Sequence, residues 1–378
     1  MIGHRESVRF RRAPHLIAYW QGGTLLIKNY ATGHLSAADP LICHILDFCT
    51  TWRTLMQIRR ALSPDASHAL PKLLTALVRR SLMHRSDVPV SPREVAMASL
   101  DEWNPAAGFF HTATKDVRFW TPKESKRQAR IRAARLRRPP AVSRYRDVPR
   151  VDLPAPDGDD VFTRVVRGRR TWRRFSNRPV SLSQLATVLG LAVGVQEWVH
   201  AGTRRIPLKT SPSGGARHPI ECYVVIRDVT GISPGIYHYA ADVHALERLR
   251  TRVPASRIRA YVPQSAYFAD ASVLFFFTAV FPRQVWRYPY ARAYRAALIE
   301  AGHVCQTLLL TATWVGLAPF EVMGLADSRI EEDLGIDGIR ESVLYAAGMG
   351  LPPSGTSWAP LRRGTLKVSL NRHLRPAT

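Results

Sequence analysis

Cysteine is scarce in this chain of 378 residues, which contains four: Cys43, Cys49, Cys222 and Cys305. No two form a Cys-x-x-Cys pair and no cluster of histidines accompanies them. The pattern therefore argues against a structural zinc site, and we expect no bound metal. Cys222 and Cys305 stand in apolar stretches. We expect both to be small buried core residues.

Long apolar segments are also absent. The longest apolar run covers residues 271–281, whereas a membrane-spanning helix needs about 20 apolar residues. Residues 1–20 lack the apolar segment of a secretory signal peptide. The sequence therefore predicts a cytoplasmic protein without a membrane span.

Acidic residues are few, with 29 Asp and Glu against 54 Lys and Arg, which gives a net charge of +25. Such an excess is typical of proteins that bind nucleic acid, an anionic membrane, or an acidic peptide or protein. The basic residues are unevenly spread: residues 123–150 contain eleven of them and two acids. We interpret residues 91–159 as a connecting segment and a basic, Pro-rich linker, in which residues 123–138 can form a basic helix.

Residues 1–90 show the pattern of a small separate domain. A strand is predicted at residues 24–28, and helices at 39–47, 51–62 and 67–80 follow, with Ser36 or Asp39 as the cap of the first. Residues 82–85 read as a short closing strand. This order is typical of a winged helix. The third helix is rich in Leu and Ala and has few side chains that read bases. Docking of a peptide or partner protein is as compatible with this pattern as DNA binding.

Residues 160–378 alternate strands and helices. Ser181 and Gln184 have capping-box spacing and predict a helix that buries Leu182, Leu185 and Leu189. Strands are predicted at 222–226, 236–239, 271–281 and 343–347, and a long central helix at 292–316. One long buried helix among strands indicates an α/β or α+β layered domain.

Two short stretches carry the chemistry of this second unit. Thr210-Ser-Pro-Ser-Gly-Gly-Ala-Arg-His-Pro-Ile-Glu221 is a loop of small residues that enters a strand. Small residues let backbone N–H groups approach a ligand closely, as in an anion-binding nest. Arg169-Arg-Thr-Trp-Arg-Arg-Phe175 is a cluster of cations that can hold a phosphate. Together they predict one bound anionic cofactor.

These stretches resemble motifs of the nitroreductase superfamily, and more narrowly of the SagB-type peptide dehydrogenases that form thiazoles and oxazoles. The arginine run resembles RRSxRxF, and Ser211-Pro-Ser-Gly-Gly-Ala-Arg-His-Pro resembles PSGGARHP. Gly231-Ile-Ser-Pro-Gly-Ile-Tyr-His-Tyr239 and Tyr294-Arg-Ala-Ala-Leu-Ile-Glu-Ala-Gly-His303 are similar to further motifs in the same order. The N-terminal region, including residues 103–115, is similar to the family's upstream region as well.

The resemblance implies an FMN-dependent, homodimeric enzyme of α+β fold, with a central mixed sheet, a long central helix and the flavin at the dimer interface. The winged-helix-like unit would precede the FMN domain at 160–378. A flavin that accepts hydride at N5 gains negative charge toward N1 and O2, which cations and amide donors stabilise. The residues implied to bind FMN, in part across the dimer, are Arg169, Arg170, Thr171, Arg173, Pro212, Ser213, Gly214, Gly215, Met323, Gly324 and, for the phosphate, Arg363.

The implied reaction oxidises an azoline ring to an azole, with a base that removes a proton while hydride leaves for the flavin. The family pattern WKYxxR corresponds here to Trp286-Arg-Tyr-Pro-Tyr-Ala-Arg292. Arg287 stands in the place of the lysine and is a poor base because its guanidinium stays protonated. Tyr288 or Tyr290 is therefore expected to carry the proton transfer, unless the chemistry differs from azoline oxidation.

Two other functions remain open at this point. One is an NAD(P)H-dependent reductase of small nitro compounds or quinones, although the chain has no Gly-x-Gly-x-x-Gly loop. The other is a basic scaffold without catalysis that binds nucleic acid or protein. In the leading interpretation the substrate is a peptide, a cyclodehydratase or similar biosynthetic protein is a possible partner, and neither a membrane nor nucleic acid is involved.

Overall fold

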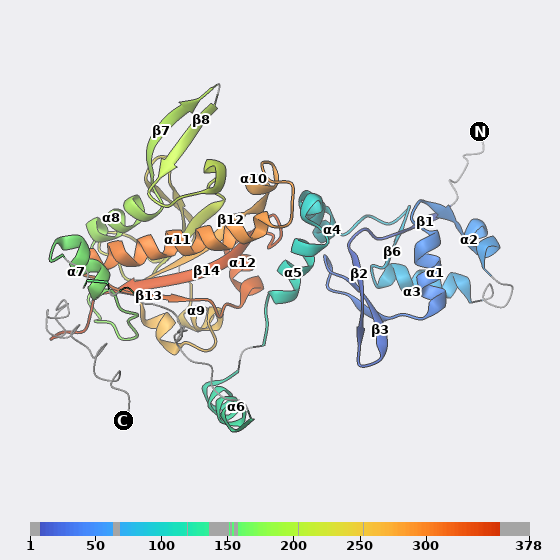
Figure 1. The fold of residues 1–378 in the computed structure, drawn as a ribbon, viewed down its shortest axis with the longest axis horizontal. Coiled ribbons are helices and arrows are strands. Elements are labelled where there is room, and N and C mark those ends of the chain that lie inside the picture. Colours follow the sequence, from blue (N-terminus) through green and yellow to red (C-terminus); the bar gives the residue numbers. More distant parts are fainter. Residues whose placement is uncertain are drawn as a thin grey trace.

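The computed structural model describes residues 8–62, 69–118, 120–135, 151, 153–154, 158–202, 204–251 and 253–355. Figure 1 shows an N-terminal unit in blue, a larger unit built around a sheet, and the helices α4 and α5 between them. None of the helices in these ranges is long and apolar enough to cross a membrane.

The N-terminal unit contains three helices and two small antiparallel sheets, with strand orders β5-β1-β6 and β2-β3-β4. Its core is formed by apolar residues of α1, α2 and α3, among them Ile45, Ile58 and Leu74. The elements are β1 (Arg9–Arg12), β2 (Leu16–Gln21), β3 (Thr24–Asn29), β4 (Leu35–Ala37), α1 (Pro40–Phe48), β5 (Arg53–Thr54), α2 (Leu55–Ala61), α3 (Leu70–Arg79) and β6 (Met83–Arg85).

The N-cap residues of α1 and α2 show where these two helices begin, and they agree with one predicted helix start and contradict the other. Asp39 caps α1, since its carboxylate accepts the N–H of Ile42 at 2.8 Å. The prediction that the second helix begins at residue 51 was wrong. Thr54 caps α2 in a capping box with Gln57, and Arg53 and Thr54 pair with β1 instead. The strands at 24–28 and 82–85 are present, whereas β1, β2 and β4 were not predicted. The start of the third predicted helix falls partly outside the described residues.

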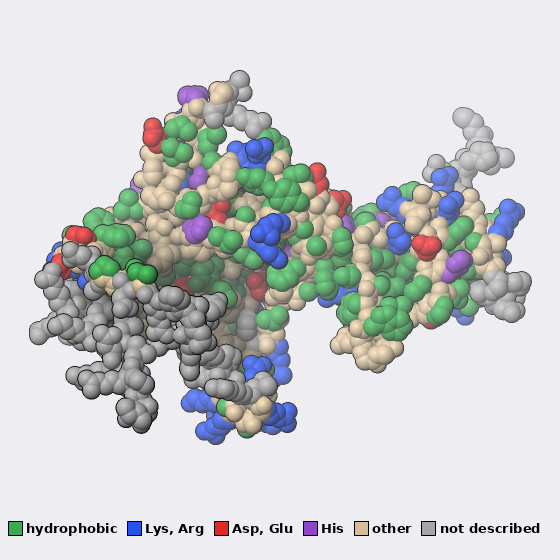
Figure 2. Space-filling view, in the orientation of Figure 1, with side chains coloured by type: hydrophobic (Ala, Val, Ile, Leu, Met, Phe, Trp, Pro, Cys, Tyr) green, Lys and Arg blue, Asp and Glu red, His purple; other side chains and the backbone are tan. Residues whose placement is uncertain are grey.

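The connecting segment folds onto the larger unit instead of linking the two freely. Its described part contains α4 (Pro92–Met97), the 3₁₀ helix η2 (Ala98–Trp103), α5 (Ala106–Thr114) and the basic helix α6 (Pro122–Arg135). The end of the predicted basic helix and most of the predicted linker, residues 136–150, lie outside the described residues. Met97 and Trp103 are completely buried in the core of the larger unit, and Lys115 forms a buried ion pair with Glu331. The Lys and Arg side chains of α6, in contrast, stand out at the bottom of Figure 2.

The larger unit is built on a six-stranded sheet with the order β11-β10-β9-β12-β14-β13. Its elements are α7 (Val161–Gly168), α8 (Leu182–Ala192), β7 (Val195–Ala201), β8 (Arg204–Lys209), the 3₁₀ helix η3 (Gly214–Ala216), β9 (Ile220–Ile226), β10 (Gly235–Ala240), β11 (Ala245–Arg250), α9 (Ala255–Tyr261), the 3₁₀ helix η4 (Ala266–Asp270), β12 (Val273–Val280), α10 (Phe281–Val285), α11 (Ala293–Trp314), β13 (Ala318–Val322), α12 (Asp327–Leu334) and β14 (Glu341–Gly350).

The predicted α+β class is correct, but the expected mixture of parallel and antiparallel strands in the central sheet is not. Every pairing that the structure describes between strands of this sheet is antiparallel. For β9, β10 and β11 the reason is connectivity, because the short connections between them reverse the chain into an antiparallel neighbour. The strands β7 and β8 form a separate two-stranded hairpin that projects at the top of Figure 1.

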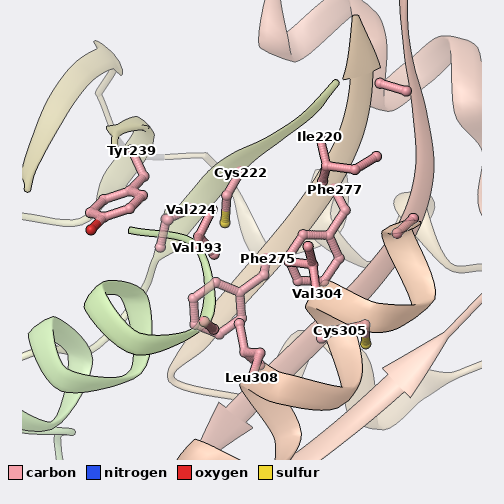
Figure 3. Packing of buried hydrophobic residues seen from close by; sticks show 14 of the residues in the cluster. Val193, Ile220, Cys222, Val224, Tyr239, Phe275, Phe277, Val304, Cys305 and Leu308 are labelled. Carbon is pink, nitrogen blue, oxygen red and sulfur yellow. The ribbon is translucent and has the colours of Figure 1, made fainter. Parts of the chain in front are cut away.

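Both faces of the sheet are buried, because side chains alternate along its strands. Phe275 and Phe277 of β12 face one core with α8 and α11, and Leu274 and Phe276 face a second core with α9 and α12. Figure 3 shows Val304 and Leu308 of α11 beside Phe275 and Phe277. Cys222 and Cys305 are buried in the first core, as predicted. Leu182 was expected to be buried too, but is 47% exposed at the first position of α8.

Candidate active site

The arginine run is held against the edge strand of the sheet. Helix α7 ends at Gly168, and the N–H of Trp172 donates to the carbonyl of Pro319 in β13 at 3.0 Å. The hydroxyl of Thr171 donates to Glu321 at 3.3 Å. The ring of Phe175 lies 5.6 Å from that of Phe320. The run that sequence motifs singled out is thereby fixed beside β13 and the residues that follow it.

The guanidinium groups of this run are not neutralised by carboxylates among the described residues. Arg169 reaches the hydroxyl of Thr171 at 3.5 Å, and Arg170 donates to the carbonyls of Arg167 and Arg169. Arg173 lies over the ring of Tyr267, 5.7 Å from its centroid. Cations without an anionic partner are a donor set that fits a phosphate or another anionic group.

Met323 and Gly324 follow directly on β13, the strand against which the arginine run is held. Met323 is 76% exposed. It lines a cavity of about 530 Å³ together with Gly302 of α11, Tyr345 of β14 and Phe110 and Val117 of the connecting segment. The size is within the range of small-molecule sites, about 300–1,000 Å³.

The glycine loop, residues 211–218, lies against the other side of α11. Its buried Ser211 hydrogen-bonds with Thr307 at 3.0 Å. Ser213 accepts the N–H of His218 at 2.8 Å and also bonds the buried Glu300. Pro212, Gly214 and Gly215 are exposed. Three positions of the loop have left-handed backbone, Gly215 at φ 61°, Ala216 at 50° and His218 at 43°, so the chain bends tightly here.

The tyrosine segment meets the glycine loop. A Cβ atom on Gly215 would lie 2.7 Å from the hydroxyl of Tyr288, and one on Gly214 3.7 Å from its ring. The guanidinium of Arg287 lies 5.9 Å from the Tyr288 ring centroid. Tyr290 is 51% exposed, with its ring 6.0 Å from that of Tyr288. The connecting segment also reaches this point, since Trp103 Nε1 donates to the carbonyl of Tyr288 at 2.8 Å.

Contacts of the described residues thus gather the predicted site residues into two groups. Arg169, Arg170, Thr171, Arg173, Met323 and Gly324 are associated with β13. Pro212, Ser213, Gly214, Gly215, Arg287, Tyr288 and Tyr290 surround the glycine loop. Helix α11 contacts the glycine loop through Glu300 and Thr307 and the β13-side cavity through Gly302. Arg363 lies outside the described residues.

Sequence reasoning missed a charged cluster on β9, β10 and β11. His238 hydrogen-bonds Glu247 at 2.8 Å and Glu221 at 3.3 Å, and Arg283 of α10 pairs with Glu221. The hydrogen bond with Glu221, followed by that with Glu247, raises the pKa of His238 to about 9. Glu221 and His238 both stand within motifs quoted above, but their proximity depends on strand register, which no local pattern reveals.

Buried ionisable groups surround the loop as well. Burial raises the pKa of Glu300 to about 7 and lowers that of His218 to about 4. Burial also lowers the pKa of Lys209, which precedes the loop at the end of β8. Perturbed groups beside a cavity are typical of functional sites. The described residues contain no group of three or more His, Cys, Asp or Glu placed to hold a metal.

Comparison with known proteins identifies similar chains for the larger unit. The sequence pattern of the nitroreductase family matches residues 166–351. A nitroreductase homologue from Methanocaldococcus jannaschii is 30% identical over 187 residues, which cover 49% of this chain and 90% of the homologue. The trifolitoxin-processing protein TfxB of Rhizobium leguminosarum bv. trifolii is 34% identical, with 36% of this chain and 38% of TfxB covered. The microcin B17-processing protein McbC of Escherichia coli is 29% identical, with 33% and 48% covered. The chain therefore spans less than half of either processing protein.

Solved structures with the same fold are more distant in sequence. The E. coli microcin synthetase McbBCD complex with truncated pro-MccB17 contains a chain that is 19% identical, with a TM-score of 0.48 and coverage of 71% of this chain and 100% of that one. A nitroreductase-like structure from Desulfovibrio desulfuricans in complex with FMN is 18% identical, with a TM-score of 0.37 and coverage of 56% and 97%.

The His238 cluster predicts a pH dependence of stability. The folded pKa of about 9 is above the ordinary value of about 6.5, so the native state holds the proton more tightly. The stabilisation is therefore complete below about pH 6.5 and is lost as the pH rises toward 9. We expect His238→Gln to lower the melting temperature most at pH 6 and least near pH 9.5.

Differential scanning calorimetry of both proteins across this pH range provides the measurement. His200→Gln is the control, because His200 is exposed on the β7–β8 hairpin. A difference between wild type and His238→Gln that stays constant with pH would contradict the assigned charge on His238.

Proposed function

This chain belongs to the nitroreductase family of oxidoreductases, and on that basis we propose that it is an FMN-dependent dehydrogenase that oxidises a peptide substrate, converting azoline rings to azoles. The proposal depends on two groups of residues. One is the arginine run beside β13, which has no carboxylate partner among the described residues, and the other is the glycine loop, which contacts Tyr288. The names of two relatives, which refer to the processing of trifolitoxin and microcin B17, favour a peptide substrate.

The residues present suit FMN in their chemistry. Arg169 and Arg173 supply positive charge without a competing carboxylate among the described residues. Met323 and Gly324 offer backbone donors beside an open cavity. When bound, FMN would supply the acceptor for the hydride that the azoline ring loses. Arg363 is part of the same proposal as a phosphate ligand.

Two copies of the chain would complete the site. Within one copy, the arginine run contacts β13 while the glycine loop contacts α11 and Tyr288. In the proposed homodimer, Pro212, Ser213, Gly214 and Gly215 of one subunit would help to hold the FMN bound by the arginines of the other. The exposed Leu298 and Ile299 on α11 supply apolar surface for such an interface.

Tyr288 is the proposed acid/base residue of the site. It is half-buried, contacts the glycine loop and has its carbonyl fixed by Trp103. Tyr290 is more exposed, and its ring packs beside that of Tyr288, whereas the described contacts of the glycine loop are with Tyr288. Arg287 keeps its proton and contributes positive charge beside the reacting group. Acting as its phenolate, Tyr288 would accept the ring proton while the hydride leaves.

The N-terminal unit, residues 1–90, is proposed to hold the peptide or a biosynthetic partner such as a cyclodehydratase. The positive charge of α6, with Lys123, Lys126 and Arg127 exposed, would attract an acidic partner. The alternative activity, NAD(P)H-dependent reduction of small nitro compounds or quinones, gives no role to this unit or to the segment that ties it to Tyr288.

Flavin binding is tested by matched arginine variants. We expect the purified protein to carry FMN and Arg169→Gln to weaken FMN binding at least tenfold, because one charge-assisted hydrogen bond contributes about 1.5–3 kcal/mol. Arg174→Gln is the control, since Arg174 belongs to the same run but is not among the proposed ligands. Fluorescence titration of the apoprotein with FMN measures both. Equal affinities of the two variants, or a wild-type protein that does not bind FMN, would count against the proposal.

Sharing of the site between subunits is tested by mixing two inactive variants. Gly215→Ala introduces a side chain at left-handed φ and 2.7 Å from the Tyr288 hydroxyl, so we expect it to disturb the loop. If the site is shared, a heterodimer of Arg169→Gln and Gly215→Ala chains contains one unaltered site. Mixed and refolded chains should then recover FMN binding, up to one site per heterodimer. Failure to recover any binding in a verified heterodimer would place both elements in one subunit's site.

Tyrosine variants test the chemistry. A short synthetic peptide that carries a thiazoline or oxazoline should lose two hydrogens, detected by mass spectrometry. We expect Tyr288→Phe to slow this oxidation about a hundredfold, the range of general acid–base catalysis, and Tyr290→Phe to change it less than about threefold, with FMN content unchanged in both. If the wild-type protein leaves both peptides unaltered while NADPH rapidly bleaches its flavin, the small-molecule reductase is the correct function.

A further inference from the structure

A second and larger cavity lies beneath the β7–β8 hairpin, and nothing in the proposed reaction uses it. This hairpin cavity has a volume of about 790 Å³ and lies between the hairpin, the glycine loop and α10. The residues that matter here are Trp198, Arg205, Lys209, Arg217, Arg283 and Trp286. Ala216, Arg217 and His218 of the glycine loop form one wall, so the cavity adjoins the loop that contacts Tyr288.

The fixed charges on the floor of the hairpin cavity neutralise one another. Glu221 pairs with Arg283 and His238, and His238 also pairs with Glu247. Because the pKa of His238 is raised to about 9 by these hydrogen bonds, the histidine is positively charged near neutral pH. The chain Arg283, Glu221, His238, Glu247 then alternates in sign and carries no net charge.

The ammonium group of Lys209 lies in the same cavity but is not part of this chain of paired charges. Its side chain lines the cavity near Glu221 and is half-buried. The described residues give it no hydrogen bond or ion pair. Glu221 and Glu300 attract it at longer range, but Glu221 already has Arg283 and His238 as partners. A half-buried ammonium without a direct partner is costly unless an anion joins it. An anion that enters the cavity can therefore pair with Lys209.

Two tryptophan rings at the rim of the cavity each have an arginine guanidinium above one face. Arg205 lies over the ring of Trp198, 4.8 Å from its centroid, and Arg217 over the ring of Trp286 at 5.3 Å. Trp198 and Trp286 are 38% and 60% exposed. Aromatic and arginine side chains at the mouth of a cavity are typical of peptide recognition, since they contact backbone and side chains with little loss of entropy.

We propose that the hairpin cavity binds an acidic segment of the peptide substrate, with one Asp or Glu carboxylate paired to Lys209 and the flanking backbone between Trp198 and Trp286. This inference rests on the proposed peptide substrate and names a specificity site for it. Glu221, Glu247 and Asp242 also line the cavity and repel a doubly charged phosphate more strongly than a singly charged carboxylate. The volume accommodates a few residues of extended peptide.

The test compares two tripeptides that differ in one charge, acetyl-Ala-Glu-Ala-amide and acetyl-Ala-Gln-Ala-amide, by calorimetric titration of the full-length protein. We expect the Glu peptide to bind at least tenfold more tightly. Lys209→Met should remove this preference, and Lys209→Arg should retain most of it. Lys72→Met is the control, because it removes one charge from the exposed surface of α3 and should leave the preference unchanged.

Several outcomes would overturn the proposal. They are a preference that survives in Lys209→Met, an absence of Glu-peptide binding at about 10 mM ligand, and binding of acetate or inorganic phosphate as tight as that of the peptide. The last result would indicate a site for free anions. The FMN content of Lys209→Met is measured in parallel from its visible absorbance. Loss of the charge preference with full FMN content supports the cavity, whereas a wild-type protein without FMN argues against the proposed function alone.

Discussion

The packing of α11 across the six-stranded sheet is the constraint on which the rest of the site depends. Val304, Cys305 and Leu308 are buried against β9 and β12, which fixes the helix in position and rotation. One side of α11 then presents Glu300 and Thr307 to the glycine loop, and the other presents Gly302 to the cavity beside Met323. Burial of apolar side chains, at about 25 cal/mol per Å², thus positions polar groups that contribute little to folding themselves.

Elements with strong local signals could be predicted from the sequence. The capping box of Ser181 and Gln184, the apolar strand β12 and the long apolar helix α11 each depend on neighbouring residues alone. The strand β1 could not be predicted, since it is short and pairs with β5 and β6, which come much later in the chain. The strands β2 and β4 pair with the neighbouring strand β3, and the Gly22-Gly23 turn between β2 and β3 is a local hairpin signal that the prediction did not use. Residues 92–114 resembled a connector, because Trp103 and His111 reveal their role only through partners in the larger unit, such as Tyr288 and Tyr294.

The same division applies to the candidate site. Runs such as Arg169–Phe175 and the glycine loop are contiguous, so motifs located them. The cluster of Glu221, His238 and Glu247 comes from three strands and forms because His238 stands opposite Tyr223 and Glu247 in the sheet. Lys209 gave no signal in the sequence, because its lowered pKa results from burial that only the folded chain produces.

The hydrogen bond from Trp103 to the carbonyl of Tyr288 joins the segment that follows the N-terminal unit to the residue proposed for proton transfer. The indole is completely buried, so the segment that carries it cannot turn without stretching the bond or leaving its N–H unpaired, at a cost of about 1–3 kcal/mol. If residues 1–90 hold the peptide or a partner as proposed, a shift of this segment on docking would change the surroundings of Tyr288. By thermodynamic reciprocity, a substrate that orders those surroundings would strengthen the docking by the same factor.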